Sequence, residues 1–230
     1  MAEAKNRLIE SLPRKDRLGL LSVCTRIELV SAEVLADPGT PMRHAYFPTE
    51  GFLSLVTPVE GSPGLEVGMI GSEGMLGVHL ALGVATSPLQ ALVQGPGLAW
   101  KASAAALQRQ LRSSAPLRDE LGRYIYVMMG QLAHSAACLR FHLIGPRLAR
   151  WFLMSQDRSH SDSFHVTHEF LACMLGVRRE CVTTAAGALQ KDGLIAYRRG
   201  EVTVLDRSGL KAASCGCYAA DQRTYLACVR

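Results

Sequence analysis

The side chains best suited to do chemistry are polar groups that share one face of a helix expected after Gly176. This face carries Arg179, Glu180, Thr183 and Thr184, and Arg178 comes directly before it. An arginine near the start of such a helix can donate two hydrogen bonds to guanine, and a carboxylate can accept one from cytosine. Hydroxyl groups can bond to bases or to phosphates. These residue types at this spacing predict a helix that recognises double-stranded DNA.

The elements that must position this face are a first helix, a tight turn and the second helix. Thr167 can cap the first helix. Its apolar stripe consists of Phe170, Leu171, Met174 and Leu175. Gly176 lies where a tight turn needs a residue free to take positive φ. The side of the second helix opposite the polar face consists of Val182, Ala185, Ala186 and Leu189. Because these residues are small or apolar, the second helix can pack closely on the first, as in a helix-turn-helix.

A basic hairpin is expected after the second helix. Gly193 ends that helix, and the sequence LIAY-RRGE-VTVL then predicts two short strands with Arg198 and Arg199 at their tip. Arginines there can neutralise phosphates, which adds affinity and salt dependence but little sequence information. The segment therefore predicts a winged helix-turn-helix. The alternative is an ordinary helical hairpin with solvated charges. Charge alone does not decide between the two interpretations, because residues 167–207 carry six Lys/Arg against five acids.

The charge is distributed unevenly along the 230 residues. Residues 1–26 carry +3, residues 27–100 carry −6 and residues 101–230 carry +8. An acidic segment at residues 27–100 and a basic segment at residues 101–230 indicate two separate functions, and a polyanion is the expected partner of the basic segment.

Three regions are expected. The chain as a whole is expected to be of the α+β class. Residues 1–115 form a sensor β-domain, because several short apolar runs between residues 27 and 100 alternate with Pro/Gly turns. Such runs predict an antiparallel β-barrel or jelly roll. Residues 116–143 form a long central helix, which Gly145-Pro146 is expected to end, and residues 144–230 form the DNA-binding domain.

The central helix carries an apolar seam. Leu121, Ile125, Met128, Leu132, Ser135 and Leu139 recur at intervals of four and three residues. This is the period of a coiled coil, so Leu121, Ile125, Met128, Leu132 and Leu139 are expected at a homodimer interface. The alternative is an amphipathic helix packed on its own domain.

Composition favours a cytoplasmic protein that is not an enzyme. No apolar run approaches the ~20 residues that span a bilayer, and the N-terminus lacks the apolar stretch of a secretory signal. Seven cysteines without framework spacing favour a reducing compartment. No GxSxG, HExxH or P-loop is present. An enzymatic β domain and a winged helix that binds protein are the competing hypotheses.

The chain resembles the Crp/Fnr superfamily of bacterial transcription regulators over essentially its whole length. The specific part is THEFLACMLGVRRECVTTAAGALQKDGLI, with RLARWFL upstream. The resemblance implies a homodimer held by the central helix, a near-palindromic operator and RNA polymerase as a further partner. It implies that Arg179 and Glu180 read bases, that Thr184 sits at a third reading position, and that Thr167 and His168 contact the DNA backbone.

The N-terminal half is similar to the family's cyclic-nucleotide-binding barrel but departs from it where phosphate binds. The phosphate cassette of cyclic-nucleotide binders has Gly-Glu-Leu and then an arginine. Here Gly71 is followed by Ser72, Glu73 and Gly74, and the later ATSPLQALVQ segment contains no arginine. Without that cation a cyclic phosphate loses its strongest contact, so gating by cyclic AMP is not expected. The candidate ligand-binding residues are Gly71, Ser72, Glu73, Gly74, Ser87 and Ser135. The alternatives are another anionic ligand, such as a cyclic dinucleotide, and thiol-based redox sensing.

No cofactor or metal is expected from the sequence. Only Cys24 lies in the first 137 residues, which excludes the N-terminal cysteine set of an iron–sulfur sensor. His44, His79 and His134 stand singly, which does not favour haem. Cys215-Gly216-Cys217 is interpreted as a pair of tail thiols, and a redox role for Cys181, Cys215 or Cys217 stays open.

Overall fold

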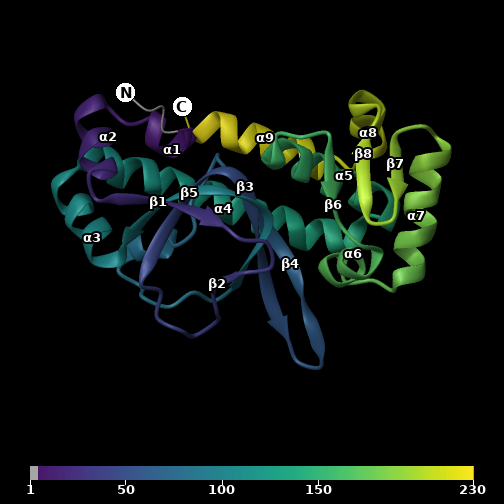
Figure 1. Ribbon diagram of the computed structural model, residues 1–230, viewed down its shortest axis with the longest axis horizontal. Helices are drawn as coiled ribbons and strands as arrows, with labels where there is room; N and C mark the ends of the chain where they lie inside the picture. The colour runs from purple at the N-terminus through teal and green to yellow at the C-terminus, as the bar shows by residue number, and fades with distance from the viewer. Residues whose placement is uncertain (1–4, 230) are drawn as a thin grey trace.

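A computed structural model describes residues 5–229, except for the side chains of residues 62 and 63. The molecule is elongated, with a β-sheet region at one end, a small helical region at the other and long helices joining them (Figure 1). Within the described residues no helix is long and apolar enough to cross a membrane.

Two short helices come first among the described residues, with Pro13 between them. They are α1 (Arg7–Glu10) and α2 (Arg14–Leu21). The Asn6 side chain accepts a hydrogen bond from the backbone N–H of Ile9 and so caps α1. Its amide nitrogen donates to the carbonyl oxygens of Pro48 and Gly74, which fixes the N-terminus on the sheet region.

The N-terminal region is built on one antiparallel sheet. Its strands are β1 (Cys24–Leu29), β2 (Val34–Ala36), β3 (His44–Val59), β4 (Ser62–Ile70) and β5 (Gln90–Ser103). Their order is β1-β5-β3-β4, with β2 paired to β5. The predicted fold class is confirmed, but the path through the described strands stays open and does not close into a barrel. A 3-10 helix, η1 (Val78–Leu82), lies between β4 and β5.

The chain then turns helical where the sequence predicts it. The elements are α3 (Ala104–Ser113), α4 (Ala115–Phe141) and α5 (Ile144–Ser159). The break between α4 and α5 falls at His142–Leu143, earlier than the predicted Gly145-Pro146. Pro146 lies in the first turn of α5, where a proline is tolerated because its missing N–H has no partner in the helix.

The predicted seam of α4 does not face solvent evenly. Leu121 is fully buried in the core of the N-terminal region, and Ser135 is only 7% exposed. Ile125, Met128, Leu132 and Leu139 are half-buried. The most exposed large apolar side chains in the middle of α4 are Tyr126 and Met129. The seam is therefore rotated toward the helix's own domain, and Leu121 cannot reach a partner without leaving the core.

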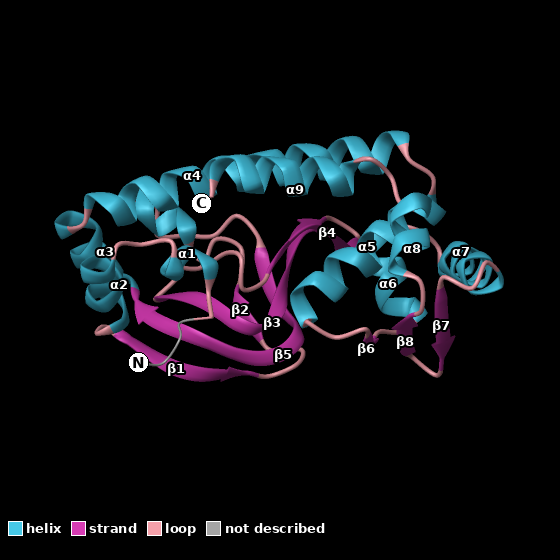
Figure 2. Ribbon diagram, turned by 90° about the horizontal axis from the view of Figure 1, so that it is seen from above, coloured by secondary structure: helices cyan, strands magenta, loops and turns pink. Residues whose placement is uncertain are grey.

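The C-terminal region combines a small sheet with helices. It contains β6 (Ser163–His165), α6 (His168–Leu175), α7 (Arg179–Lys191), β7 (Ile195–Arg198), β8 (Glu201–Val204), α8 (Arg207–Ala213) and α9 (Cys217–Cys228). The sheet order is β6-β8-β7. The last helix, α9, leaves this region and packs along α4, back toward the N-terminal end (Figure 2). This return of α9 along α4 is not predicted from the sequence.

Candidate DNA-binding surface and effector cavity

The first helix of the motif is set by its two ends. The Thr167 hydroxyl accepts a hydrogen bond from the backbone N–H of Phe170 at 3.1 Å, so Thr167 is the N-cap of α6. Gly176 ends α6 in the left-handed conformation, with φ of 62°. A Cβ at Gly176 would lie 2.7 Å from Cδ1 of Leu65, so the turn also contacts β4 closely. The predicted cap and turn are both confirmed.

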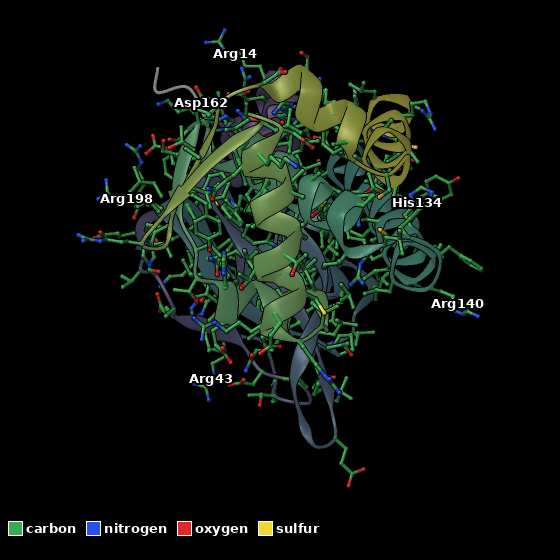
Figure 3. The ribbon with its side chains drawn as sticks, turned by 90° about the vertical axis from the view of Figure 1, so that its right-hand side faces the viewer. Arg14, Arg43, His134, Arg140, Asp162 and Arg198 are labelled. Atoms are coloured by element: carbon green, nitrogen blue, oxygen red, sulfur yellow. The ribbon has the colours of Figure 1, made fainter. Side chains whose placement is uncertain are left out.

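The second helix has the two predicted faces. Its buried residues are Val182, Ala185, Ala186 and Leu189. The exposed residues at and just before its N-terminal end include Arg178, Arg179, Glu180, Thr183 and Thr184. The hydroxyls of Thr183 and Thr184 each donate to the carbonyl oxygen four residues earlier and keep lone pairs free to accept. Figure 3 shows α7 facing the viewer at this end of the molecule.

His168 joins the two helices and the wing. Its Nδ1 lies 3.0 Å from the Thr183 hydroxyl, and its ring meets the Tyr197 ring edge-on at 4.5 Å. Partial burial lowers the pKa of His168, and the nearby Arg179 lowers it further. The imidazole is therefore neutral at pH 7 and holds the elements together through hydrogen bonding and packing.

The wing is a two-residue hairpin. Arg199 and Gly200 both have positive φ, which defines a type I′ turn. Arg198 and Arg199 are exposed, and Arg198 extends outward from the wing (Figure 3). Glu201 lies opposite Arg198 in the ladder, but its carboxylate is 2.7 Å from His165 Nδ1. In the described structure neither wing arginine has a salt bridge. The nine predicted DNA-binding residues thus lie on adjoining elements.

A cavity of about 560 Å³ lies between the end of β4, α4, the end of α5 and α9. Ser72 and Glu73 line it, as do Tyr124, Arg158 and Tyr225. Arg158 Nε donates to the Glu73 carboxylate at 2.8 Å, and Tyr225 donates to the Glu73 carbonyl at 2.9 Å. Because Arg158 belongs to α5 and Tyr225 to α9, the cavity is closed by elements that the sequence analysis did not connect with it.

The predicted ligand residues are only partly brought together. Ser72 and Glu73 line the cavity, whereas Ser87 and Ser135 do not. The backbone N–H of Gly71 donates to the Glu73 carboxylate, and that of Gly74 donates to the Gly71 carbonyl. These two groups are therefore not free to hold a phosphate. A Cβ at Gly74 would lie 2.1 Å from the Tyr124 hydroxyl, so this turn needs glycine for close approach to α4.

A buried carboxylate connects the sheet to the DNA-binding region. Glu66 on β4 accepts a hydrogen bond from the Trp151 indole of α5 at 2.9 Å, and its second oxygen has no partner among the described residues. Burial raises the pKa of Glu66 to about 7, although the nearby Ser54 hydroxyl, the Trp151 hydrogen bond and the charges of Arg158 and Arg150 oppose the shift. The carboxylate is thus poised to change charge near neutral pH.

Metal-ligating side chains gather elsewhere. Across residues 5–229, the one group of histidine, cysteine or acidic side chains close enough to share an ion lies at the junction of α4 and α5. It lies outside both the DNA-binding surface and the cavity lining.

Comparison with known sequences identifies the C-terminal motif. A family model described as a Crp-like helix-turn-helix domain matches residues 146–213. The match covers α5, α6, α7 and the wing. A search of curated proteins finds no match.

Comparison with solved structures covers the whole chain. It is similar to a Eubacterium rectale protein described as a transcriptional regulator of the Crp/Fnr family, with a TM-score of 0.70, 15% identity, and 92% of this chain and 99% of that one covered. It is similar to the c-di-GMP-responsive global regulator CLP of Xanthomonas campestris (TM-score 0.67, 20% identity, 84% and 99% covered). It is also similar to FixK2 of Bradyrhizobium japonicum (TM-score 0.68, 13% identity, 84% and 98% covered). Because the sequence identities are only 13–20%, these similarities show a shared fold and nothing more.

Proposed function

We propose that the chain is a Crp/Fnr-type transcription regulator that binds a near-palindromic DNA site as a homodimer, a proposal supported by its Crp-like helix-turn-helix domain and its fold. In this proposal residues 1–115 sense, residues 116–143 dimerise and residues 144–230 bind DNA in the cytoplasm. RNA polymerase is the further partner.

The observation that carries the proposal is the polar, exposed start of α7. Arg179 and Glu180 lie in its first turn, which in a helix-turn-helix enters the major groove. There Arg179 can donate to guanine and Glu180 can accept from cytosine. Arg178, Thr167 and the two wing arginines flank this face and supply contacts to phosphates.

Dimerisation is supported by the exposed face of α4. Tyr126 and Met129 are 61% and 64% exposed, which is unusual for side chains of this size in the middle of a helix. Ile125 and Leu132 are half-buried on the adjoining side of α4. We therefore place the partner helix against Tyr126 and Met129, with Ile125 and Leu132 at the edge of the contact. Two-fold symmetry would then present two copies of α7 to two half-sites.

The sensor is proposed not to take cyclic AMP by the family's arginine cassette. The sole Lys or Arg between residues 27 and 100 is Arg43, which is exposed, extends away from the molecule (Figure 3) and is not part of the cavity lining. Glu73 is already paired with Arg158. An anion entering the cavity would meet Arg7, whose guanidinium lies 6.0 Å from the centre of the Tyr225 ring and has no salt bridge within the described chain.

The positive charge of Arg7 in the cavity lining favours a second, narrower proposal, in which an anionic ligand other than cyclic AMP occupies the cavity. CLP, which shares the fold, is c-di-GMP-responsive. Calorimetric titration separates the cases: cyclic AMP should show no micromolar binding, whereas an anion that binds wild type should bind Arg7→Ala more weakly. Micromolar binding of cyclic AMP would overturn the first statement, and equal anion binding by Arg7→Ala would overturn the second.

The direct test of DNA binding is anisotropy with a random-sequence duplex at several salt concentrations. Binding should weaken linearly on a logarithmic scale as salt rises, because phosphate contacts release counterions. An absence of duplex binding at low salt would contradict the proposal, and so would a preference for a protein partner over DNA.

A further inference from the structure

Four side chains with metal-binding atoms meet where α4 ends. Cys138 lies in the last turn of α4 and His142 follows the end of the helix. Cys215 lies in the connection between α8 and α9, and Cys217 is the first residue of α9. The four donor atoms all lie within 4.8 Å of one another, and the three cysteines are buried. Residues more than 70 positions apart in the chain are thus brought to one point.

From this geometry we infer a structural zinc site formed by Cys138, His142, Cys215 and Cys217. Three thiolates and one imidazole are a common ligand set of closed, four-coordinate zinc. With usual zinc–sulfur and zinc–nitrogen bonds, neighbouring donors on a tetrahedron are about 3.6–3.8 Å apart. The Cys138 and Cys215 sulfurs are 3.4 Å apart, and Cys217 Sγ is 3.7 Å from His142 Nδ1. These two pairs are within a few tenths of an ångström of tetrahedral spacing, and since all four donors lie within 4.8 Å, the other pairs exceed it by at most about 1 Å.

The same distances argue against other uses of these thiols. A disulfide would need sulfurs about 2.05 Å apart, and the structure has all three cysteines free. An iron–sulfur cluster spreads its ligands over several iron atoms, which the compact donor group does not allow. The cysteines also form a small cluster of their own, separate from the three larger apolar cores, so packing alone does not explain why they meet.

The surroundings suit a negatively charged zinc–thiolate centre. Three thiolates outweigh the charge of Zn²⁺ by one unit, and the buried Arg150 lines the same small pocket as Cys138, so that a positive charge lies beside the site. Arg150 is in turn held by Asp221 of α9 at 2.6 Å.

The position of the site indicates what it does. All four coordination positions are filled by the protein, so the site is structural rather than catalytic. It joins the α4–α5 junction, where the N-terminal half meets the DNA-binding half, to the start of α9. Because α9 packs along α4 and supplies Tyr225 to the cavity, the zinc ion would hold both the junction and one cavity wall in place.

The test is the metal content of the purified full chain, measured by plasma mass spectrometry after dialysis against a weak chelator. Wild type should retain one zinc ion per chain. Cys138→Ser and Cys217→Ser should lose it, while Cys181→Ser, at an exposed cysteine of α7, should keep it. Replacing zinc with Co²⁺ should give the intense visible bands of a tetrahedral ion and a thiolate charge-transfer band.

Three outcomes would overturn the inference, and none of them depends on DNA binding. They are a wild-type chain that neither contains nor takes up zinc, a Co²⁺ spectrum of octahedral type, and a Cys138–Cys215 disulfide in protein prepared without oxidant. If the serine variants do not fold, the zinc content and the Co²⁺ spectrum of wild type still decide the question.

Discussion

Replacing Arg179 with alanine should remove one base-specific contact from each half-site while leaving the fold intact. Arg179 is the first residue of α7, is exposed and makes no salt bridge in the described structure. Alanine is a better helix former than arginine, so α7 should persist. A bidentate arginine–guanine contact is worth about 1–3 kcal/mol. The dimer loses two such contacts, or about 2–6 kcal/mol, so the Kd for the preferred site should rise by at least about 30-fold.

The assay is fluorescence anisotropy with the preferred duplex and with duplexes changed at one base pair at a time. The variant should lose discrimination at one position in each half-site and keep it elsewhere, while its binding to random duplex changes little. Arg112→Ala, at an exposed arginine on the remote α3, is the matched control and should bind like wild type. If Arg179→Ala binds the preferred site with unchanged Kd and unchanged base preference, α7 is not the reading helix.

Three further predictions follow from other parts of the molecule. Arg198→Ala should weaken binding to all duplexes alike and reduce the slope of log affinity against log salt by about 2, since the dimer loses one phosphate contact in each half-site; an unchanged slope would place the wing away from DNA. Met129→Lys should convert a dimer to a monomer in sedimentation, whereas Val59→Lys, at an exposed apolar residue of β3, should not; a dimeric Met129→Lys would move the interface elsewhere. Glu66 keeps its proton in the folded chain up to about pH 7 but loses it near its ordinary value of 4.5 when unfolded, so stability should fall as pH rises between these values. Glu66→Gln should abolish that fall and be up to about 3 kcal/mol more stable at pH 8 in urea unfolding; a wild-type stability that rises over this window would contradict the burial argument.

The helix-turn-helix could be predicted from sequence because its signals are local. The Thr167 cap, the positive φ of Gly176 and the small inner face of α7 are each set by residues within a few positions. Local propensity and tertiary packing agree there, so the prediction and the structure coincide.

The dimer seam shows where periodicity is insufficient. A four-three spacing of apolar residues marks one side of a helix but does not say what covers it. Leu121 belongs to the chain's own core, while Tyr126 and Met129, outside the seam, are the exposed pair. Deciding between these faces requires knowing how α4 sits on the sheet, which depends on long-range contacts.

The cavity and the cysteine cluster could not be predicted because both depend on α9. Nothing local in residues 217–228 indicates that this helix returns along α4. Only that return brings Tyr225 to Glu73, and only the α8–α9 connection brings Cys215 to Cys138. Ligand spacing along the chain, a useful guide for compact zinc motifs, carries no signal across such a separation.

The central claim is that a dimer of this chain reads a symmetric DNA sequence with α7 and the wing. Selection of bound duplexes from a random pool, followed by footprinting of the enriched sequence, tests it most directly. The account predicts enrichment of a near-palindrome whose protected half-sites lie about one helical turn apart. Enrichment of no sequence, or of a single asymmetric half-site protected on its own, would contradict it.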